Sequence, residues 1–410
     1  MMRRGLPVLG LLMAGLTLWF AWQGLGWRPL PQLDAPYTEK LHDARFAGAA
    51  AEAGRHLREA RKWLGAPALS AAVSIDGKLV WAGVSGWADL ETLKPATLDT
   101  AFRIGSTSKP LTATALARLV DAGLIDLDKP IGVYVAGLPN PDWTGLTPRQ
   151  LVSHTAGIPD YIHNGDLRGV LDWLLERQQF PTLRDGLGMF DGSRLLFEPG
   201  TGFLYSSFDV NLLGVAMEEA AHEPYLDLMK DWVLRPLGLS RTQADHADRP
   251  VADRAKFYRS TGSAARPWRE VNHSYKWPSG GLLSTPSDLV RIGGAWFDPG
   301  FIRPETVRRF WTPQRLADGR LNPEHYALGW RANEQTLLRG PGWPVFNVHH
   351  GGVSDGAFSW LNLYPDHAFA IALTMNTQGD SFAAFMSEEF AITRAFLDRL
   401  DTIDRGAAAP

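Results

Sequence analysis

The hydrophobic positions in the first half of the chain alternate between helical and strand patterns. From 38 to 64, apolar residues recur on a rough helical stripe, which predicts a helix. Residues 68–73 and 79–84 are two short apolar runs around the turn Asp76-Gly77, which predicts a β-hairpin at the edge of an antiparallel sheet. From 106 to 123 the chain is apolar nearly all round, which predicts a buried helix that ends at a glycine.

The second half of the chain first reads as helical and then as stranded. Residues 162–196 alternate helical patterns with polar turns and look like a helical insertion. Three short apolar runs then predict strands at 345–348, 358–363 and 368–375. An amphipathic pattern over 381–400 predicts a closing helix.

The N-terminus carries a long apolar run, 6–22, directly after Arg3 and Arg4. At about 1.5 Å per residue, a helix of this length just spans a bilayer core of about 30 Å. We therefore expect 1–27 to be an uncleaved signal anchor that tethers the protein to the inner membrane and places the remainder in the bacterial periplasm. The alternative is a signal peptide cut near Gly24-Leu25-Gly26, which would leave the protein soluble in the periplasm.

Composition narrows the class of protein further. The chain has 410 residues, enough for a large core, and a net charge of −3, which gives no electrostatic reason to expect a nucleic-acid partner. It contains no cysteine, which excludes disulfides, thiol nucleophiles and thiolate metal sites.

The strongest chemical signal is the pair Ser106 and Lys109. At a spacing of three on a helix, the two side chains lie on one face, one turn apart. A serine hydroxyl needs a base to become a nucleophile, and a desolvated lysine amine can serve as one. Pro110 fits the first helical turn, and the free N–H of Ser106 would face a developing oxyanion. The alternative is a helix-capping serine beside a solvated lysine, because the motif alone is short.

Three further positions are chemical candidates. A phenol with a lowered pKa at Tyr205 could shuttle a proton between Ser106 and a leaving group, although a buried tyrosine is also an ordinary core residue. His154 is either a base or a structural brace in its loop. His349 and His350 are adjacent in a predicted strand and point to opposite faces, so we expect no metal site, and no cofactor is indicated.

Five stretches, in this order, give the chain its resemblance to the serine β-lactamase-like family of class C β-lactamases, D,D-peptidases and esterases. They are Phe102–Lys109, Leu151–Tyr161, Glu198–Tyr205, Gly280–Asp288 and His350–Gly356. The segment Ser274-Tyr275-Lys276-Trp277 is most similar to the branch that contains the mitochondrial β-lactamase-like serine protease and its bacterial relatives.

The resemblance implies an α+β fold, in which helices flank an antiparallel sheet beside an all-helical subdomain. It implies a hydrolase domain over 67–400, with the helical subdomain at roughly 111–270, a linker and lead-in helix at 28–66, and a tail at 401–410.

The resemblance also implies roles for individual residues. Ser106 would be the nucleophile, Lys109 its base, and Tyr205 and His350 the other catalytic positions. The backbone N–H groups of Ser106 and Val353 would form the oxyanion hole. Ser207, Gly351 and Gly352 would contact substrate.

Two departures from the family pattern argue against an efficient β-lactamase. Ser207 stands where the family usually has asparagine, and His350 stands where the β-lactamases have lysine. The expected function is a serine hydrolase acting on an ester or amide substrate, small or peptidic, through an acyl-enzyme. The alternative is an inactive, membrane-tethered binding or scaffolding protein of the same fold.

Overall fold

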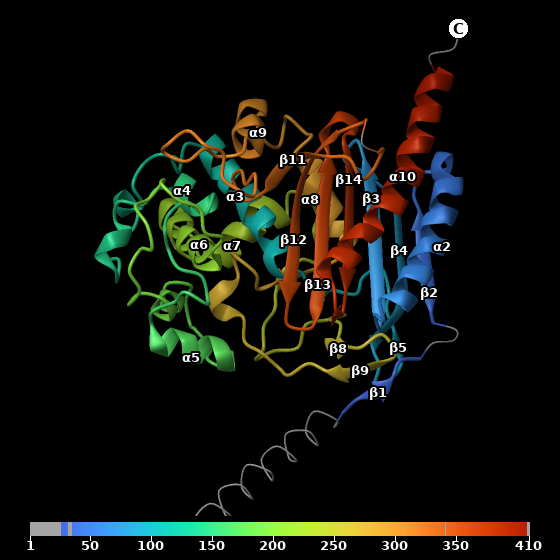
Figure 1. Cartoon of the computed structure of the whole chain (residues 1–410), viewed down its shortest axis with the longest axis horizontal. Coiled ribbons are helices and arrows are strands. Elements are labelled where there is room, and N and C mark those ends of the chain that lie inside the picture. Colours follow the sequence, from blue (N-terminus) through green and yellow to red (C-terminus); the bar gives the residue numbers. More distant parts are fainter. Residues whose placement is uncertain (1–25, 32–34, 341, 408–410) are drawn as a thin grey trace, which may run out of the picture.

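An antiparallel sheet forms one side of the molecule in the computed structural model, which describes residues 26–31, 35–340 and 342–407 (Figure 1). The strands pair in the order β11-β12-β13-β14-β3-β4-β2, and β5 adds to β4. Their bounds are β2 Tyr37–Leu41, β3 Ala68–Ile75, β4 Lys78–Asp89, β5 Lys94–Pro95, β11 Arg331–Gln335, β12 Val345–Ser354, β13 Ala357–Tyr364 and β14 Phe369–Met375.

Helices cover both faces of this sheet. On one face, α2 (Ala47–Trp63) and α10 (Phe382–Ala407) pack side by side, and their apolar residues form a core with the strands beneath them. On the other face, α8 (Pro286–Ala295) lies against β3 and β14. Because both faces are covered, β3, β13 and β14 are buried along their whole lengths.

The helical side of the molecule packs into the core that α8 shares with the sheet (Figure 1). Its helices are α3 Ser108–Asp121, α4 Pro148–Val152, α5 Leu167–Leu175, α6 Ser207–Ala221, α7 Tyr225–Met229, a π-helix Lys230–Leu234 and α9 Pro304–Trp311. Single 3₁₀ turns occur at Ala44–Phe46, Gly105–Thr107, Ile131–Val133, Pro141–Trp143, Asp185–Met189, Ser274–Lys276 and Pro365–His367.

Two small sheets join the helical side to the main sheet. One consists of β6 (Phe102–Arg103), β10 (Leu282–Ser284) and β7 (Gln243–Ala244), and β6 leads directly to Ser106. The other has the order β1-β9-β8-β15, with bounds β1 Arg28–Pro29, β8 Tyr258–Ser260, β9 Ala264–Pro267 and β15 Thr377–Gln378.

The α+β architecture is as the resemblance implied, and several local expectations are corrected. The predicted helix over 38–64 is wrong at its start, because residues 37–41 form edge strand β2 and the helix begins only at Ala47. The hairpin β3–β4 exists but does not lie at an edge, since β14 pairs with β3 and β2 covers β4. The final helix runs on to Ala407, through most of the segment expected to be a tail.

The expected membrane anchor lies outside the described residues. Within the part of the chain that the structure describes, no helix is both long enough and apolar enough to cross a bilayer.

Candidate active site

Ser106 sits where the small sheet turns into α3. It lies in the 3₁₀ turn Gly105–Thr107, and α3 continues from Ser108. Gly105 has φ +46° and packs so tightly on β12 that a side chain there would come within 2.4 Å of the Val353 carbonyl oxygen. Only glycine accepts both constraints. Ser106 is partly exposed while its neighbours on both sides are buried, so it is the residue of this turn that solvent can reach.

Lys109 is buried beside that hydroxyl. Its Nζ atom lies 3.1 Å from Ser106 Oγ, 3.2 Å from Ser207 Oγ and 2.9 Å from the Ser279 carbonyl oxygen. Burial lowers the pKa of the Lys109 amine well below its ordinary value, and the nearby charge of Arg331 lowers it further. The solvated-lysine alternative for this motif is therefore wrong.

The three neighbours of Lys109 suit a neutral amine. Such an amine has two N–H groups and one lone pair. The Ser279 carbonyl can only accept a hydrogen bond, and Ser207 can accept a second, which leaves the lone pair for the proton of the Ser106 hydroxyl. This is the arrangement that a general base requires.

Tyr205 lies against the same pair of residues. Lys109 Nζ is 4.8 Å from the centre of its ring, and the Ser106 side chain is close enough to lower the pKa of its phenol. The expected lowering of the Tyr205 pKa is wrong: burial raises it, and Arg331 and Ser106 only partly offset this. The phenol therefore stays protonated and can donate a proton to a leaving group, rather than act as an anionic base.

His154 braces the loop that carries Tyr205. Its backbone adopts φ +61°, its carbonyl accepts a hydrogen bond from Leu204 N at 3.0 Å, and its ring packs 4.4 Å from the ring of Tyr205. Nδ1 lies 3.0 Å from Asp209 Oδ2. The structural interpretation of His154 therefore holds, because the ring faces Asp209 and aromatic residues and is fully buried.

His350 is turned into the protein. Its Nδ1 lies 2.7 Å from the Gly351 carbonyl, which can only accept, so Nε2 accepts the hydroxyl of Tyr326 at 2.9 Å. Burial and the charge of Arg331 hold the pKa of His350 well below its usual range. Both ring nitrogens are occupied, and the ring is neutral. Neither ring nitrogen is therefore left to bind a substrate carboxylate, and the catalytic role of His350 stays a prediction.

Two of the remaining predicted substrate contacts, Gly351 and Gly352, have packing roles in the structure. A side chain on Gly351 would meet the ring of Phe382 at 2.4 Å, and one on Gly352 would meet the Ile104 carbonyl oxygen at 1.9 Å. The lack of a side chain at these glycines therefore lets Phe382 and Ile104 pack directly against β12. Ser207 contacts Lys109 at 3.2 Å. Substrate binding by Ser207, Gly351 and Gly352, and the oxyanion role of Val353, stay predictions.

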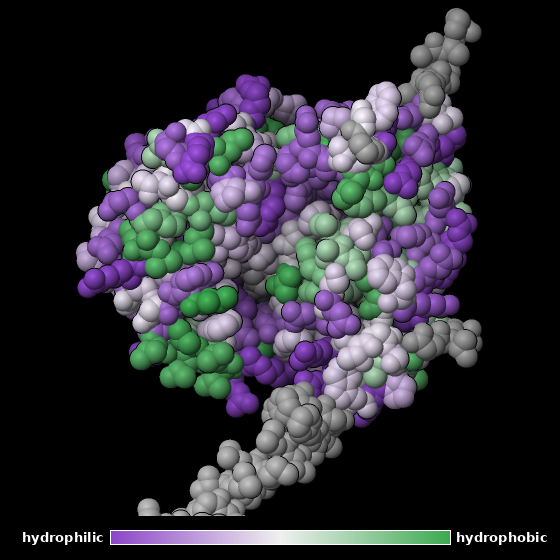
Figure 2. Space-filling model, viewed as in Figure 1, coloured by the Kyte–Doolittle hydropathy of each residue, from purple (hydrophilic) through white to green (hydrophobic). Residues whose placement is uncertain are grey.

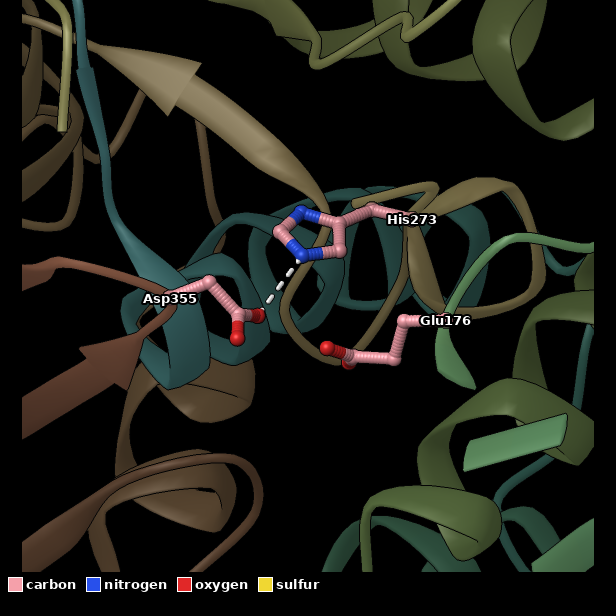
Figure 3. Close-up of side chains that lie close together, drawn as sticks. All are labelled: Glu176, His273 and Asp355. Atoms are coloured by element: carbon pink, nitrogen blue, oxygen red, sulfur yellow. Dashed lines mark hydrogen bonds and ion pairs between the residues drawn. The ribbon is translucent and has the colours of Figure 1, made fainter. Parts of the chain in front are cut away.

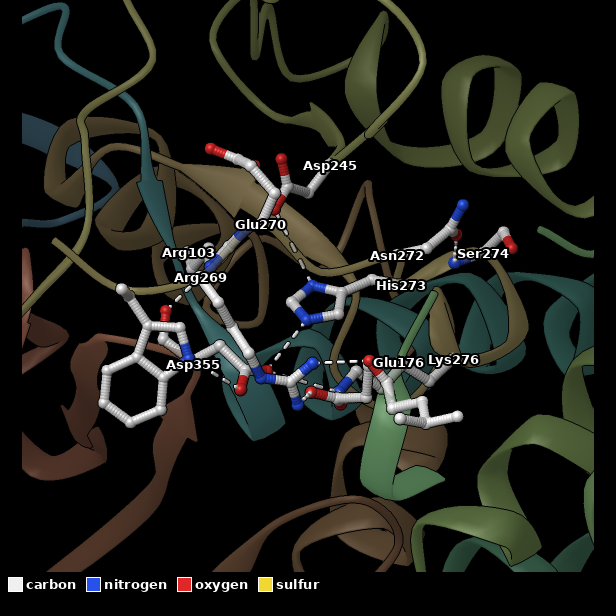
Figure 4. Close-up of polar contacts among 12 residues, drawn as sticks. Arg103, Glu176, Asp245, Arg269, Glu270, Asn272, His273, Ser274, Lys276 and Asp355 are labelled. Carbon is white, nitrogen blue, oxygen red and sulfur yellow. Dashed lines mark hydrogen bonds and ion pairs between the residues drawn. The ribbon is translucent and has the colours of Figure 1, made fainter. Parts of the chain in front are cut away.

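A buried charge cluster lies beside the site. Glu176, His273 and Asp355 converge from three different segments (Figure 3), with His273 Nε2 at 2.9 Å from Asp355 Oδ2. Three carboxylate and imidazole groups so close together could ligate a metal ion. Here the Lys276 ammonium supplies the positive charge, since its Nζ lies 2.8 Å from Glu176 Oε1 and 3.7 Å from Asp355 Oδ2 (Figure 4).

This cluster holds the backbone around the nucleophile in place. The carbonyl of Lys276 accepts hydrogen bonds from the N–H groups of Ser279, Gly280 and Gly281, and Ser279 in turn holds Lys109. Asp355 follows β12 closely, and its carbonyl accepts a hydrogen bond from the Arg103 guanidinium at 2.8 Å (Figure 4). Burial would raise the pKa of Asp355, but the bond from His273 and the charge of Lys276 outweigh it and lower that pKa.

Sequence reasoning did not assign two neighbours of the site, Arg331 and Ser279. Arg331 on β11 lies 5.3 Å from the ring centre of Tyr205 and 5.2 Å from that of Tyr326, and it pairs with Glu324. Ser279 acts through its backbone carbonyl, so its side chain gave no signal. The pairing of β11 with β12 brings Arg331 opposite His349, a register that only the folded sheet reveals.

A partly exposed serine beside a desolvated lysine at the start of a helix, in a fold whose helices flank an antiparallel sheet, defines the class of serine β-lactamase-like hydrolases. The chain belongs to the β-lactamase family, whose profile, described as Beta-lactamase, matches residues 54–391.

Among curated proteins, the chain is 28% identical to the human mitochondrial serine beta-lactamase-like protein LACTB, over 82% of this chain and 75% of that protein. It is 27% identical to esterase EstB of Burkholderia gladioli, over 76% of this chain and 77% of that protein. Among solved structures, it is similar to SurE, with a TM-score of 0.66 and 26% identity, over 86% of this chain and 75% of that one.

Proposed function

We propose that the protein hydrolyses an ester or amide, peptide amides included, through a covalent acyl-enzyme on Ser106. One observation carries the proposal: Ser106 Oγ lies 3.1 Å from the amine of Lys109, whose pKa burial lowers well below the ordinary value. A neutral amine at this distance can take the hydroxyl proton as Oγ attacks.

In the first step, Ser106 gives its proton to Lys109 while Oγ forms a bond to the substrate carbonyl carbon. The carbonyl oxygen becomes an oxyanion, for which the N–H groups of Ser106 and Val353 are the expected donors, and one such donor is typically worth about 3 kcal/mol. As the tetrahedral intermediate collapses, Tyr205 donates its proton to the departing alcohol or amine and regains one from the Lys109 ammonium. Water, deprotonated by the same amine, then attacks the acyl carbon. The bond to Ser106 Oγ breaks as the Lys109 ammonium returns its proton to Oγ, and the acid is released.

The surroundings of the site favour a substrate that does not need His350 to bind a carboxylate group. Both nitrogens of His350 already have partners within the protein. Ser207 stands where the family usually has asparagine, and its hydroxyl contacts the amine of Lys109. We therefore do not expect Ser207 to hold the amide group of a substrate as an asparagine would. Hydrolysis of β-lactams is therefore expected to be weak, and the similarity to esterase EstB favours esters as the first substrates to try.

The test is intact-mass measurement after incubation with a fluorophosphonate and with a small panel of esters, peptide amides and β-lactams. Wild-type protein should gain the mass of one adduct, and Ser106→Ala should gain none. The matched control is Ser240→Ala, which removes an exposed serine hydroxyl and should be labelled like wild type. Labelling of Ser106→Ala at the wild-type rate would contradict the proposal. No adduct on the wild-type protein would instead favour the inactive binding protein of the same fold.

A further inference from the structure

An unpartnered leucine face lies on α5. Leu167, Leu171, Leu174 and Leu175 are spaced i, i+4, i+7 and i+8, which places them on one side of the helix. Leu167 is 80% exposed and Leu171 is 59% exposed. The opposite side of α5 packs inward, since Gly169 is buried and Trp173 stacks on Tyr161. Soluble proteins rarely expose so many large apolar side chains together, so this face is a candidate contact surface.

A second feature on the same edge of the molecule is positively charged. The small sheet β1-β9-β8-β15 carries Arg28, Arg259 and Arg266 and no acidic residue. Arg28 and Arg259 are exposed, and Arg266 lies 5.3 Å from the ring centre of Trp27. Such a surface attracts anionic groups, and tryptophan beside arginine is typical of the zone where a protein meets lipid head groups.

Both features lie along one edge. Figure 1 places α5 and β1 on the same lower side of the molecule, and Figure 2 shows apolar surface gathered over the α5 region. In the sequence, the apolar run 6–22 ends six residues before β1 begins at Arg28. The chain therefore connects its most lipid-compatible sequence to this edge, beside the arginine sheet.

We propose that this edge rests on an anionic lipid bilayer, with the leucine face of α5 buried among the acyl chains and the arginines of β1, β8 and β9 against the head groups. An interfacial amphipathic helix of this kind inserts only its apolar face, and anionic lipid strengthens the contact. The contact would fix the orientation of the hydrolase on the membrane, independently of whether the N-terminal segment is cleaved.

The absence of cysteine makes the test direct. A single Leu171→Cys substitution in the full chain, labelled with an environment-sensitive fluorophore, reports on the surroundings of the α5 face alone. The matched control is Leu337→Cys, a leucine that is 66% exposed and lies between β11 and β12, away from this edge. Both proteins are incorporated into vesicles of phosphatidylglycerol and phosphatidylcholine, and into vesicles of phosphatidylcholine only. Hydrolysis of an ester by each labelled protein checks that it is folded.

The expected result is a blue-shifted emission from position 171 in the anionic vesicles, with at least a twofold quenching by lipids that carry a quencher in their acyl chains. The effect should weaken without phosphatidylglycerol or in high salt, and position 337 should show neither change. Water-like emission from position 171 in vesicle-bound protein would overturn the proposal, even if the N-terminal run holds the protein on the vesicle. The same blue shift without vesicles, growing with protein concentration, would also overturn it and assign the face to a second copy of the chain.

Discussion

The carboxyl group of Asp209 lies against the ring of His154, and both side chains are fully buried. Nδ1 of His154 accepts the backbone N–H of Ser206 at 3.3 Å and also lies 3.0 Å from Asp209 Oδ2. A ring nitrogen that accepts an N–H cannot carry a proton itself, so the proton between the two side chains belongs to the carboxyl group. Burial raises the pKa of Asp209 well above its ordinary value and lowers that of His154, in agreement with this assignment.

The first prediction follows from that proton. Asp209→Asn should keep wild-type stability, because the amide still donates to Nδ1. Asp209→Ala should lose about 1–3 kcal/mol, because it leaves buried polar groups without a partner. The alanine variant should also lower kcat, since the ring of His154 packs against Tyr205. Urea denaturation and ester hydrolysis measure both effects. An asparagine variant as unstable as the alanine variant would mean that the carboxylate is charged.

The second prediction concerns the acid side of the pH profile. The amine of Lys109 works only when neutral, so kcat/KM should rise with pH through the lowered pKa of Lys109 and level off well below pH 10.5, the ordinary value. Lys109→Met should reduce acylation by about 10²–10⁴-fold at every pH. Single-turnover hydrolysis of a p-nitrophenyl ester measures both. A profile that rises only near pH 10.5 would show that the amine is not desolvated.

The third prediction separates the two proton carriers. Tyr205→Phe removes the phenol but keeps the ring that packs against His154, so stability should change little. Turnover should fall by about 10²–10⁴-fold, because the leaving group loses its proton donor. Esters with a good leaving group, such as p-nitrophenol, should suffer much less than alkyl esters. An equal loss for both kinds of ester would contradict the role of proton donor.

The fourth prediction concerns stability in weak acid. Burial lowers the pKa of His349 to about 3 and that of His273 to about 4, against an ordinary value of 6.5. Below pH 6.5 the two histidines bind protons in the unfolded chain but stay neutral in the folded chain. Their contribution to the free energy of unfolding is therefore complete above pH 6.5 and is lost as the pH falls toward those lowered values. The slope approaches about 1.4 kcal/mol per pH unit for each such histidine.

Thermal unfolding between pH 7 and pH 4.5 measures this loss. His349→Gln should flatten the dependence by one such slope, and the exposed His222→Asn should keep the wild-type dependence. A variant at His349 with the wild-type slope would place the titrating group elsewhere.

Local sequence chemistry was enough to predict the nucleophile and its helix. The spacing of Ser106 and Lys109, the first-turn Pro110 and the glycine after α3 all lie within 18 residues, and each has a local physical meaning. Strands β12, β13 and β14 were predicted for the same reason, although β12 runs on to Ser354, beyond the predicted 345–348.

What the sequence did not reveal depends on pairing between distant segments. Strand β2 looked helical because an exposed edge strand has no strict alternation to distinguish it, and only β4 gives it a partner. The pKa of Tyr205 was predicted in the wrong direction because depth of burial, and not neighbouring charge, sets it. Ser279 contributes a carbonyl, a group that every residue has, so no motif could identify it.

The three contacts of Lys109 come from three separate segments: the 3₁₀ turn before α3, the start of α6, and the turn at Ser279 before β10. If these segments separate even slightly, water reaches the amine, its ammonium form returns and the serine loses its base. Catalysis should therefore fail at a lower temperature than global unfolding. A partly opened molecule, whether newly made or damaged, would have no hydrolytic activity.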